Sequence, residues 1–101
     1  GRFPQVSGLK FTFDAGKLPG QRVIEATVGG KRVVDDAVYS IATSDFLVSR
    51  SGDGYTMFKE AKILLPADKA PKDSEVFEKA IKDSPNATIS PKVEGRITRL
   101  N

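Results

Sequence analysis

The clearest hydrophobic pattern in the chain is a strict alternation of apolar and polar residues near its beginning. In the segment LKFTFD, the apolar residues Leu9, Phe11 and Phe13 are each followed by a polar residue. A period of two places alternate side chains on opposite faces of a strand, so this pattern predicts a half-buried β-strand. Leu9, Phe11 and Phe13 are its expected inner face.

A second pattern predicts a β-hairpin. Arg22 to Val28 is an apolar-rich, alternating run, and Lys31 to Val34 is a second short run. Between them stands Gly29-Gly30, a pair in which both residues can adopt positive φ. Two strand-like runs separated by such a pair are typical of a two-residue hairpin turn.

The middle of the chain, Tyr39 to Phe58, has three parts. Tyr39 to Val48 alternates in the manner of a strand, although neither face is purely apolar. Ser49 to Gly54 is a polar turn in which Gly52 and Gly54 flank one acid. From Tyr55 onward, the apolar spacing changes to that of a helix. The sequence therefore predicts a strand, a turn and a helix in this order.

The last part of the chain predicts a second helix and two short strands. Asp73 and Ser74 are candidate N-caps, and an apolar stripe follows at helical spacing. The helix is expected to end at Ser84-Pro85-Asn86, because proline interrupts a helix. Residues 87–90 and 95–101 read as short strands. The pattern as a whole predicts one α+β domain over residues 1–101, with a mixed, largely antiparallel sheet and two covering helices.

Composition narrows the chemistry available to the chain. It has 101 residues, a net charge of +3, no cysteine and no histidine. Without histidine, the commonest general base and zinc ligand is missing, and serine or cysteine triads that depend on histidine are excluded within this chain. Basic and acidic residues are interspersed, which does not indicate a nucleic-acid surface. No apolar run has the length of a transmembrane helix.

Two residues of the central segment are candidate ligand contacts. Phe46 shares its predicted strand face with small residues, so its ring either packs in the core or stands open to stack on a flat ligand. Asp53 either forms a turn with its own backbone or accepts hydrogen bonds from a ligand that Gly52 and Gly54 allow to come close. The residues alone leave both alternatives open.

Five blocks of sequence, in order, resemble the C-terminal domain of the 5'-nucleotidase family, which includes UDP-sugar hydrolases and ecto-5'-nucleotidases. The blocks are GRFPQVSG (1–8), FTFD (11–14), RVIEATVGGK (22–31), TSDFLVSRSGDGYTMF (43–58) and PKVEGRI (91–97). The resemblance extends over essentially the whole chain. It implies the fold of that domain and a role in binding the nucleoside part of a nucleotide.

The resemblance also implies roles for particular residues. Two aromatic rings of the family enclose the base, and their motifs match at Phe3 and Phe46. The acid of the glycine turn contacts the ribose, and it matches Asp53 between Gly52 and Gly54. No catalytic residue and no metal ligand is implied in this chain. Two departures affect the turn: Ser51 replaces a glycine usual in the family, and one extra residue stands between Phe46 and Asp53.

By the same resemblance, the chain is most of a substrate-binding domain whose catalytic partner lies elsewhere. Hydrolysis is expected to need two divalent metal ions in an N-terminal metallophosphoesterase domain, with a nucleotide as substrate. The chain alone is expected to be inactive, and the intact protein periplasmic, cell-surface or secreted. An N-terminal truncation would leave an apolar surface uncovered, or covered by a dimer or crystal contact. The alternative function is a non-catalytic interaction module with Phe46 in its core.

Overall fold

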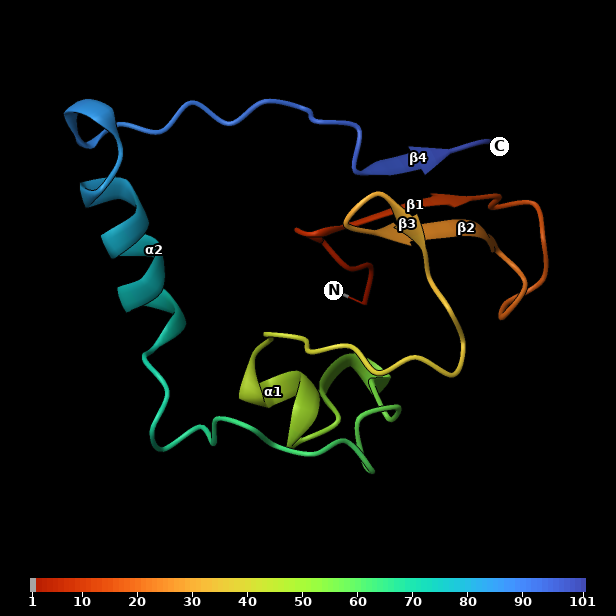
Figure 1. Ribbon diagram of the computed structural model, residues 1–101, viewed down its shortest axis with the longest axis horizontal. Helices are drawn as coiled ribbons and strands as arrows, with labels where there is room; N and C mark the ends of the chain where they lie inside the picture. Colours follow the sequence, from red (N-terminus) through yellow and green to blue (C-terminus); the bar gives the residue numbers. More distant parts are fainter. Residues whose placement is uncertain (1) are drawn as a thin grey trace. The chain divides into compact units, whose positions relative to one another are not determined.

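The computed structural model describes residues 2–101, whose helices and strands are drawn in Figure 1. These residues fall into two compact units. The sheet unit comprises Phe3–Ser40 and Lys92–Asn101. The helical unit comprises Ile41–Pro91 together with Arg2. Each unit is described by itself below.

The sheet unit is a four-stranded mixed sheet in the order β3-β2-β1-β4. The β1–β2 and β2–β3 pairs are antiparallel, and the β1–β4 pair is parallel. The strands are β1 (Leu9–Phe13), β2 (Val23–Val28), β3 (Lys31–Arg32) and β4 (Ile97–Arg99). The alternating strand, the hairpin at Gly29-Gly30 and the strand near the C-terminus are therefore confirmed.

Strand β1 lies at the centre of the pairing. Its Phe11 stands opposite Ala26 on β2 and Ile97 on β4, so one row of apolar residues crosses three strands. A register shift between Thr12 and Phe13 places Phe13 opposite Val23. Such an irregularity bends the strand locally. The parallel β4 joins residues at the two ends of the sequence, which a local hairpin pattern does not reveal.

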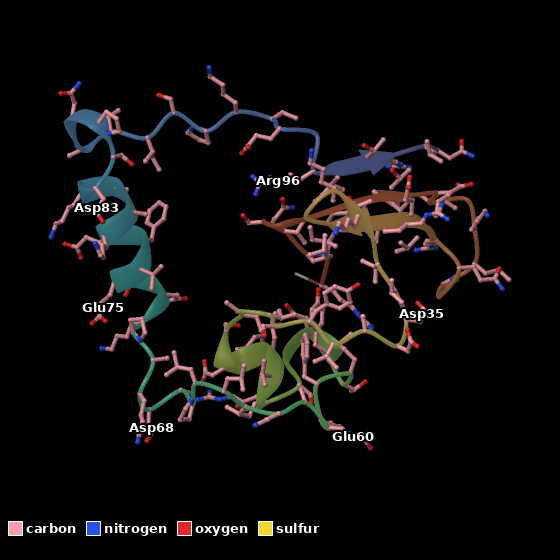
Figure 2. The ribbon with its side chains drawn as sticks, in the orientation of Figure 1. Asp35, Glu60, Asp68, Glu75, Asp83 and Arg96 are labelled. Carbon is pink, nitrogen blue, oxygen red and sulfur yellow. The ribbon has the colours of Figure 1, made fainter. Side chains whose placement is uncertain are left out.

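The helical unit contains two α-helices and two single 3-10 turns. They are α1 (Asp45–Val48), η1 (Gly52–Gly54), α2 (Asp73–Lys82) and η2 (Pro85–Ala87). With the mixed sheet, these helices confirm the α+β class. Helix α2 confirms the predicted C-terminal helix, but its N-cap is Lys72 rather than Asp73 or Ser74. The Lys72 backbone N–H donates to the carboxylate of Glu75, labelled in Figure 2, at 3.1 Å.

The prediction of a strand over Tyr39 to Val48 is wrong. Residues 39–44 belong to no regular element, and the next four form α1. Ser44 is the extended N-cap, and its carbonyl accepts hydrogen bonds from the N–H groups of Leu47 and Val48. Asp45 in the first turn also suits the positive end of a helix. These local bonds outweigh an alternation that had no purely apolar face.

Two further predictions from periodicity are wrong. No helix begins at Tyr55, whose ψ of 84° is not helical and which follows left-handed residues at Asp53 and Gly54. The described segment from 55 to 72 contains no helix or strand. Residues 87–90 form no strand, because Asn86 and Ala87 have positive φ and lead out of the 3-10 turn.

No apolar side chain in residues 2–101 is fully buried. The apolar stripe of α2 illustrates this, because Val76 is 53% exposed and Phe77 is 59% exposed. Exposed apolar side chains are spread over both units, and the apolar surface expected from a truncation, like the contact that would cover it, stays a prediction. No described helix combines the length and apolar character required to cross a membrane.

Candidate functional site

Phe46 and Gly52 form the tightest contact of the candidate site. Phe46 is the second residue of α1, and its ring packs directly on the backbone of Gly52, the first residue of η1. A Cβ added at Gly52 would lie 2.3 Å from Cε1, 2.4 Å from Cδ1 and 2.5 Å from Cζ of the ring. Gly52 is buried, whereas Phe46 is 48% exposed. The ring is therefore held on one side and open elsewhere.

Asp53 follows directly and presents an exposed carboxylate. Its backbone is left-handed, with φ 52° and ψ 22°, and Gly54 follows with φ 74°. Within residues 2–101, its carboxylate makes no observed hydrogen bond or ion pair. Asp14, by contrast, forms a turn between its carboxylate and the nearby backbone, because the Gly16 N–H donates to its Oδ1 at 2.8 Å. The turn-forming alternative for Asp53 thus has no contact to support it, and its acceptor oxygens are available to a ligand.

Tyr55, which the sequence did not single out as a candidate site residue, anchors the chain directly after the glycine turn. Its hydroxyl donates to the carbonyl oxygen of Arg2 at 2.5 Å. The Arg2 guanidinium lies beside the turn, because a Cβ at Gly54 would be 3.4 Å from Nη1. This bond joins residues 53 apart in sequence. No local pattern could have predicted it.

Phe3 lies in the sheet unit, in a cluster of three aromatic rings. Its ring centroid is 5.4 Å from that of Phe13 and 6.2 Å from that of Phe11, with tilts of 58° and 47°. Tilted pairs at these separations are favourable. Phe3 nevertheless remains 53% exposed. It is supported by the rings of β1 on one side while a large part of its surface stays open.

The structure brings together Phe46, Gly52, Asp53 and Gly54, all within the helical unit. Phe3 belongs to the sheet unit, so its pairing with Phe46 stays a prediction. Both rings are about half exposed. No apolar side chain of the described residues is fully buried, so the alternative of an interaction module with Phe46 in its core stays a prediction.

Metal-binding side chains do not gather in the described residues. Over 2–101, no three Asp, Glu, His or Cys side chains are arranged to hold an ion. What the chain offers instead is a half-exposed aromatic ring on Gly52, followed in sequence by the exposed carboxylate of Asp53. That pair can stack on a ring and accept hydrogen bonds from neighbouring hydroxyls.

Comparison with known proteins places these features in context. Residues 1–60 match the family described as 5'-nucleotidase, C-terminal domain. The trifunctional nucleotide phosphoesterase protein YfkN of Bacillus subtilis (strain 168) is 41% identical over 105 residues. The 5'-nucleotidases of Diplobatis ommata and of Homo sapiens are 32% and 33% identical over 105 residues each.

The matches cover nearly all of this chain but little of each relative. They span 99% of the chain and 7% of the Bacillus protein, and 96% of the chain and 17% of the Diplobatis and human proteins. The chain therefore corresponds to a small part of longer proteins. No solved structure matches it.

Proposed function

Because the chain belongs to the 5'-nucleotidase C-terminal domain family, we propose that it is the nucleoside-binding part of an enzyme that hydrolyses nucleoside 5'-phosphates. The observation that carries this proposal is the half-open Phe46 ring, which packs on Gly52, the residue directly before the exposed Asp53. The names of the relatives agree with it, since they are 5'-nucleotidases and a nucleotide phosphoesterase.

In this proposal, each group has a separate task. The open face of Phe46 stacks on the base, an interaction that tolerates different bases because each has a π-face. Asp53 accepts hydrogen bonds from the two ribose hydroxyls, for which two carboxylate oxygens are suited. Phe3 supplies the second ring of the base clamp, as the family resemblance implies. Together they orient the nucleotide so that its phosphate is presented to the catalytic centre.

The hydrolysis itself is assigned to the rest of the enzyme. Two divalent cations in a metallophosphoesterase domain would polarise the phosphate ester and activate water. The chain's own residues bind and orient the substrate and take no part in bond cleavage. The proposal also places the intact protein outside the cytoplasm, in the periplasm, on the cell surface or in the medium.

The test compares Phe46→Ala with wild type in the complete polypeptide that contains this chain. Stacking contributes about 1–3 kcal/mol per base, so the KM for adenosine 5'-phosphate should rise roughly 5- to 140-fold with little change in kcat. The KM for ribose 5-phosphate, which has no base, should not change. Phe77→Ala is the matched control, because Phe77 is another exposed phenylalanine of the same unit that lies outside the site.

An unchanged KM for adenosine 5'-phosphate in Phe46→Ala would rule out the stacking role. An equal loss of activity with both substrates would also contradict it, because a base-specific contact cannot affect ribose 5-phosphate. The isolated chain should release no phosphate from either substrate.

A further inference from the structure

Arg96 connects the end of the sequence to its beginning within the sheet unit. Its Nη1 donates a hydrogen bond to the carbonyl oxygen of Val6 at 2.5 Å, across 90 residues of sequence and in a partly buried position. Arg96 is labelled in Figure 2, where it stands at the start of β4. Its Nη2 is 3.4 Å from a carboxylate oxygen of Glu94. Both halves of the guanidinium are thus engaged.

The backbone of Arg96 is fixed as firmly as its side chain. Its carbonyl oxygen accepts a hydrogen bond of 2.9 Å from the N–H of Phe11, within the parallel pairing of β1 and β4. The guanidinium therefore projects from a residue that the sheet holds in place. An arginine anchored in this way can fix whatever its planar group binds.

The group that it binds belongs to the segment that carries Phe3. Residues 3–8 are irregular, and in the described part of the chain no hydrogen bond is observed between their main chain and another main-chain group. The segment is held by the Arg96 bond to Val6 and by the contacts of the Phe3 ring with Phe11 and Phe13. Only one residue of ordinary flexibility, Gln5, separates Val6 from Pro4, whose ring fixes φ. Pro4 and Gln5 are thus the only residues between the Phe3 ring and the carbonyl group that Arg96 binds.

We propose that Arg96 is a positioning residue of the nucleoside site, which holds the base-stacking ring of Phe3 in place through its hydrogen bond to the Val6 carbonyl. The inference rests on the proposed function, since it assigns Arg96 an effect on the substrate only through Phe3. Arginine suits this role because its fork can bind Val6 and Glu94 at once. A lysine has a single nitrogen and cannot reproduce both contacts in the same plane.

The experiment is a double-mutant cycle in the complete polypeptide, with Arg96→Ala, Phe3→Ala and the double variant. Phe3→Ala should raise the KM for adenosine 5'-phosphate at least about fivefold through lost stacking, with kcat retained. Arg96→Ala should raise the same KM by a smaller or equal factor. In the Phe3→Ala background, Arg96→Ala should add nothing, because the ring through which it acts is gone.

Two further measurements separate positioning from general destabilisation. Arg96→Ala should leave the KM and kcat for ribose 5-phosphate unchanged, and Arg96→Lys should restore part of the loss for adenosine 5'-phosphate. The matched control is Arg32→Ala on β3, which removes an equally charged residue that pairs with Glu25 instead. Its KM for both substrates should equal that of wild type.

The possible failures are distinguishable. If Phe3→Ala raises the KM and Arg96→Ala does not, Arg96 does not act through Phe3. The same holds if the two effects multiply in the double variant. In both cases the inference about Arg96 is overturned while the proposed function stands. If Phe3→Ala and Phe46→Ala both leave the KM unchanged, the proposed function fails and the inference falls with it. Equal losses with adenosine 5'-phosphate and ribose 5-phosphate in Arg96→Ala also overturn the positioning role.

Discussion

Replacing Gly52 by alanine should displace the ring of Phe46 while leaving the fold almost intact. The added methyl would lie 2.3 Å from the nearest ring carbon, Cε1. Carbon atoms in contact are about 3.5 Å apart or more, so the ring must retreat by about 1.2 Å, the difference between the two distances. Gly52 does not have the positive φ of Gly54, so the alanine itself introduces no left-handed strain.

The Gly52→Ala substitution should cost less free energy of folding than free energy of base binding. The atoms in conflict are at the end of a side chain that is 48% exposed, so the ring can turn toward solvent. Overpacking in a closed core costs about 1–3 kcal/mol, and an open position should lie at or below the low end of that range. The displaced ring can no longer stack on a base, which costs about 1–3 kcal/mol of binding.

The assay measures the KM for adenosine 5'-phosphate and the urea midpoint of the same variant. Gly52→Ala should raise the KM roughly 5- to 140-fold, as Phe46→Ala does, because the same stacking is lost. The midpoint should move little. The variant Gly52→Ala in a Phe46→Ala background is the decisive control, since the methyl then meets no ring and the KM should not rise further.

Two results would refute this reasoning. A further rise in KM from Gly52→Ala in the absence of the Phe46 ring would show that the glycine acts directly, for example by letting the ligand approach its backbone. A large loss of stability with unchanged KM would show that the contact serves the fold and not the site.

Two further predictions concern the same turn. Tyr55→Phe should lower the free energy of unfolding by about 0.5–1.5 kcal/mol in urea denaturation, through loss of the bond to the Arg2 carbonyl, and an unchanged midpoint would contradict it. Ser51→Gly should raise the free energy of unfolding by up to about 1 kcal/mol, because Ser51 has φ 50° and glycine adopts that conformation without strain. Ser49→Gly is its control, since Ser49 has φ −85° and should lose stability on the same substitution.

The sheet was predictable because each of its signals is local and consistent. Strand β1 has three apolar residues in strict alternation, and the hairpin has two glycines, both with positive φ in the structure. Helix α2 was predictable from its apolar stripe and from the stop signal that begins at Ser84. Its observed N-cap, Lys72, lies one residue before the first predicted candidate, Asp73. In these places propensity, period and turn chemistry agree, so a sequence pattern suffices.

The central segment was mispredicted because its signals conflict. Tyr39 to Val48 alternates without a purely apolar face, and four of its residues follow the cap at Ser44 into α1 instead. The helical spacing after Tyr55 is overridden by left-handed residues before it. The bonds from Tyr55 to Arg2 and from Arg96 to Val6 join residues 53 and 90 positions apart, distances at which periodicity carries no information.

The surroundings of Gly52 and Gly54 change how the glycine turn should be understood. From sequence, Gly52 and Gly54 read as a pair that lets a ligand approach the backbone. In the structure they differ, because Gly52 is covered by the Phe46 ring while Gly54 has positive φ and lies beside Arg2. The first glycine therefore supports the aromatic surface, and the second turns the chain so that Asp53 is exposed between them. Substitutions at 52 and 54 should therefore act by different physical routes, a clash with the Phe46 ring at 52 and backbone strain at 54.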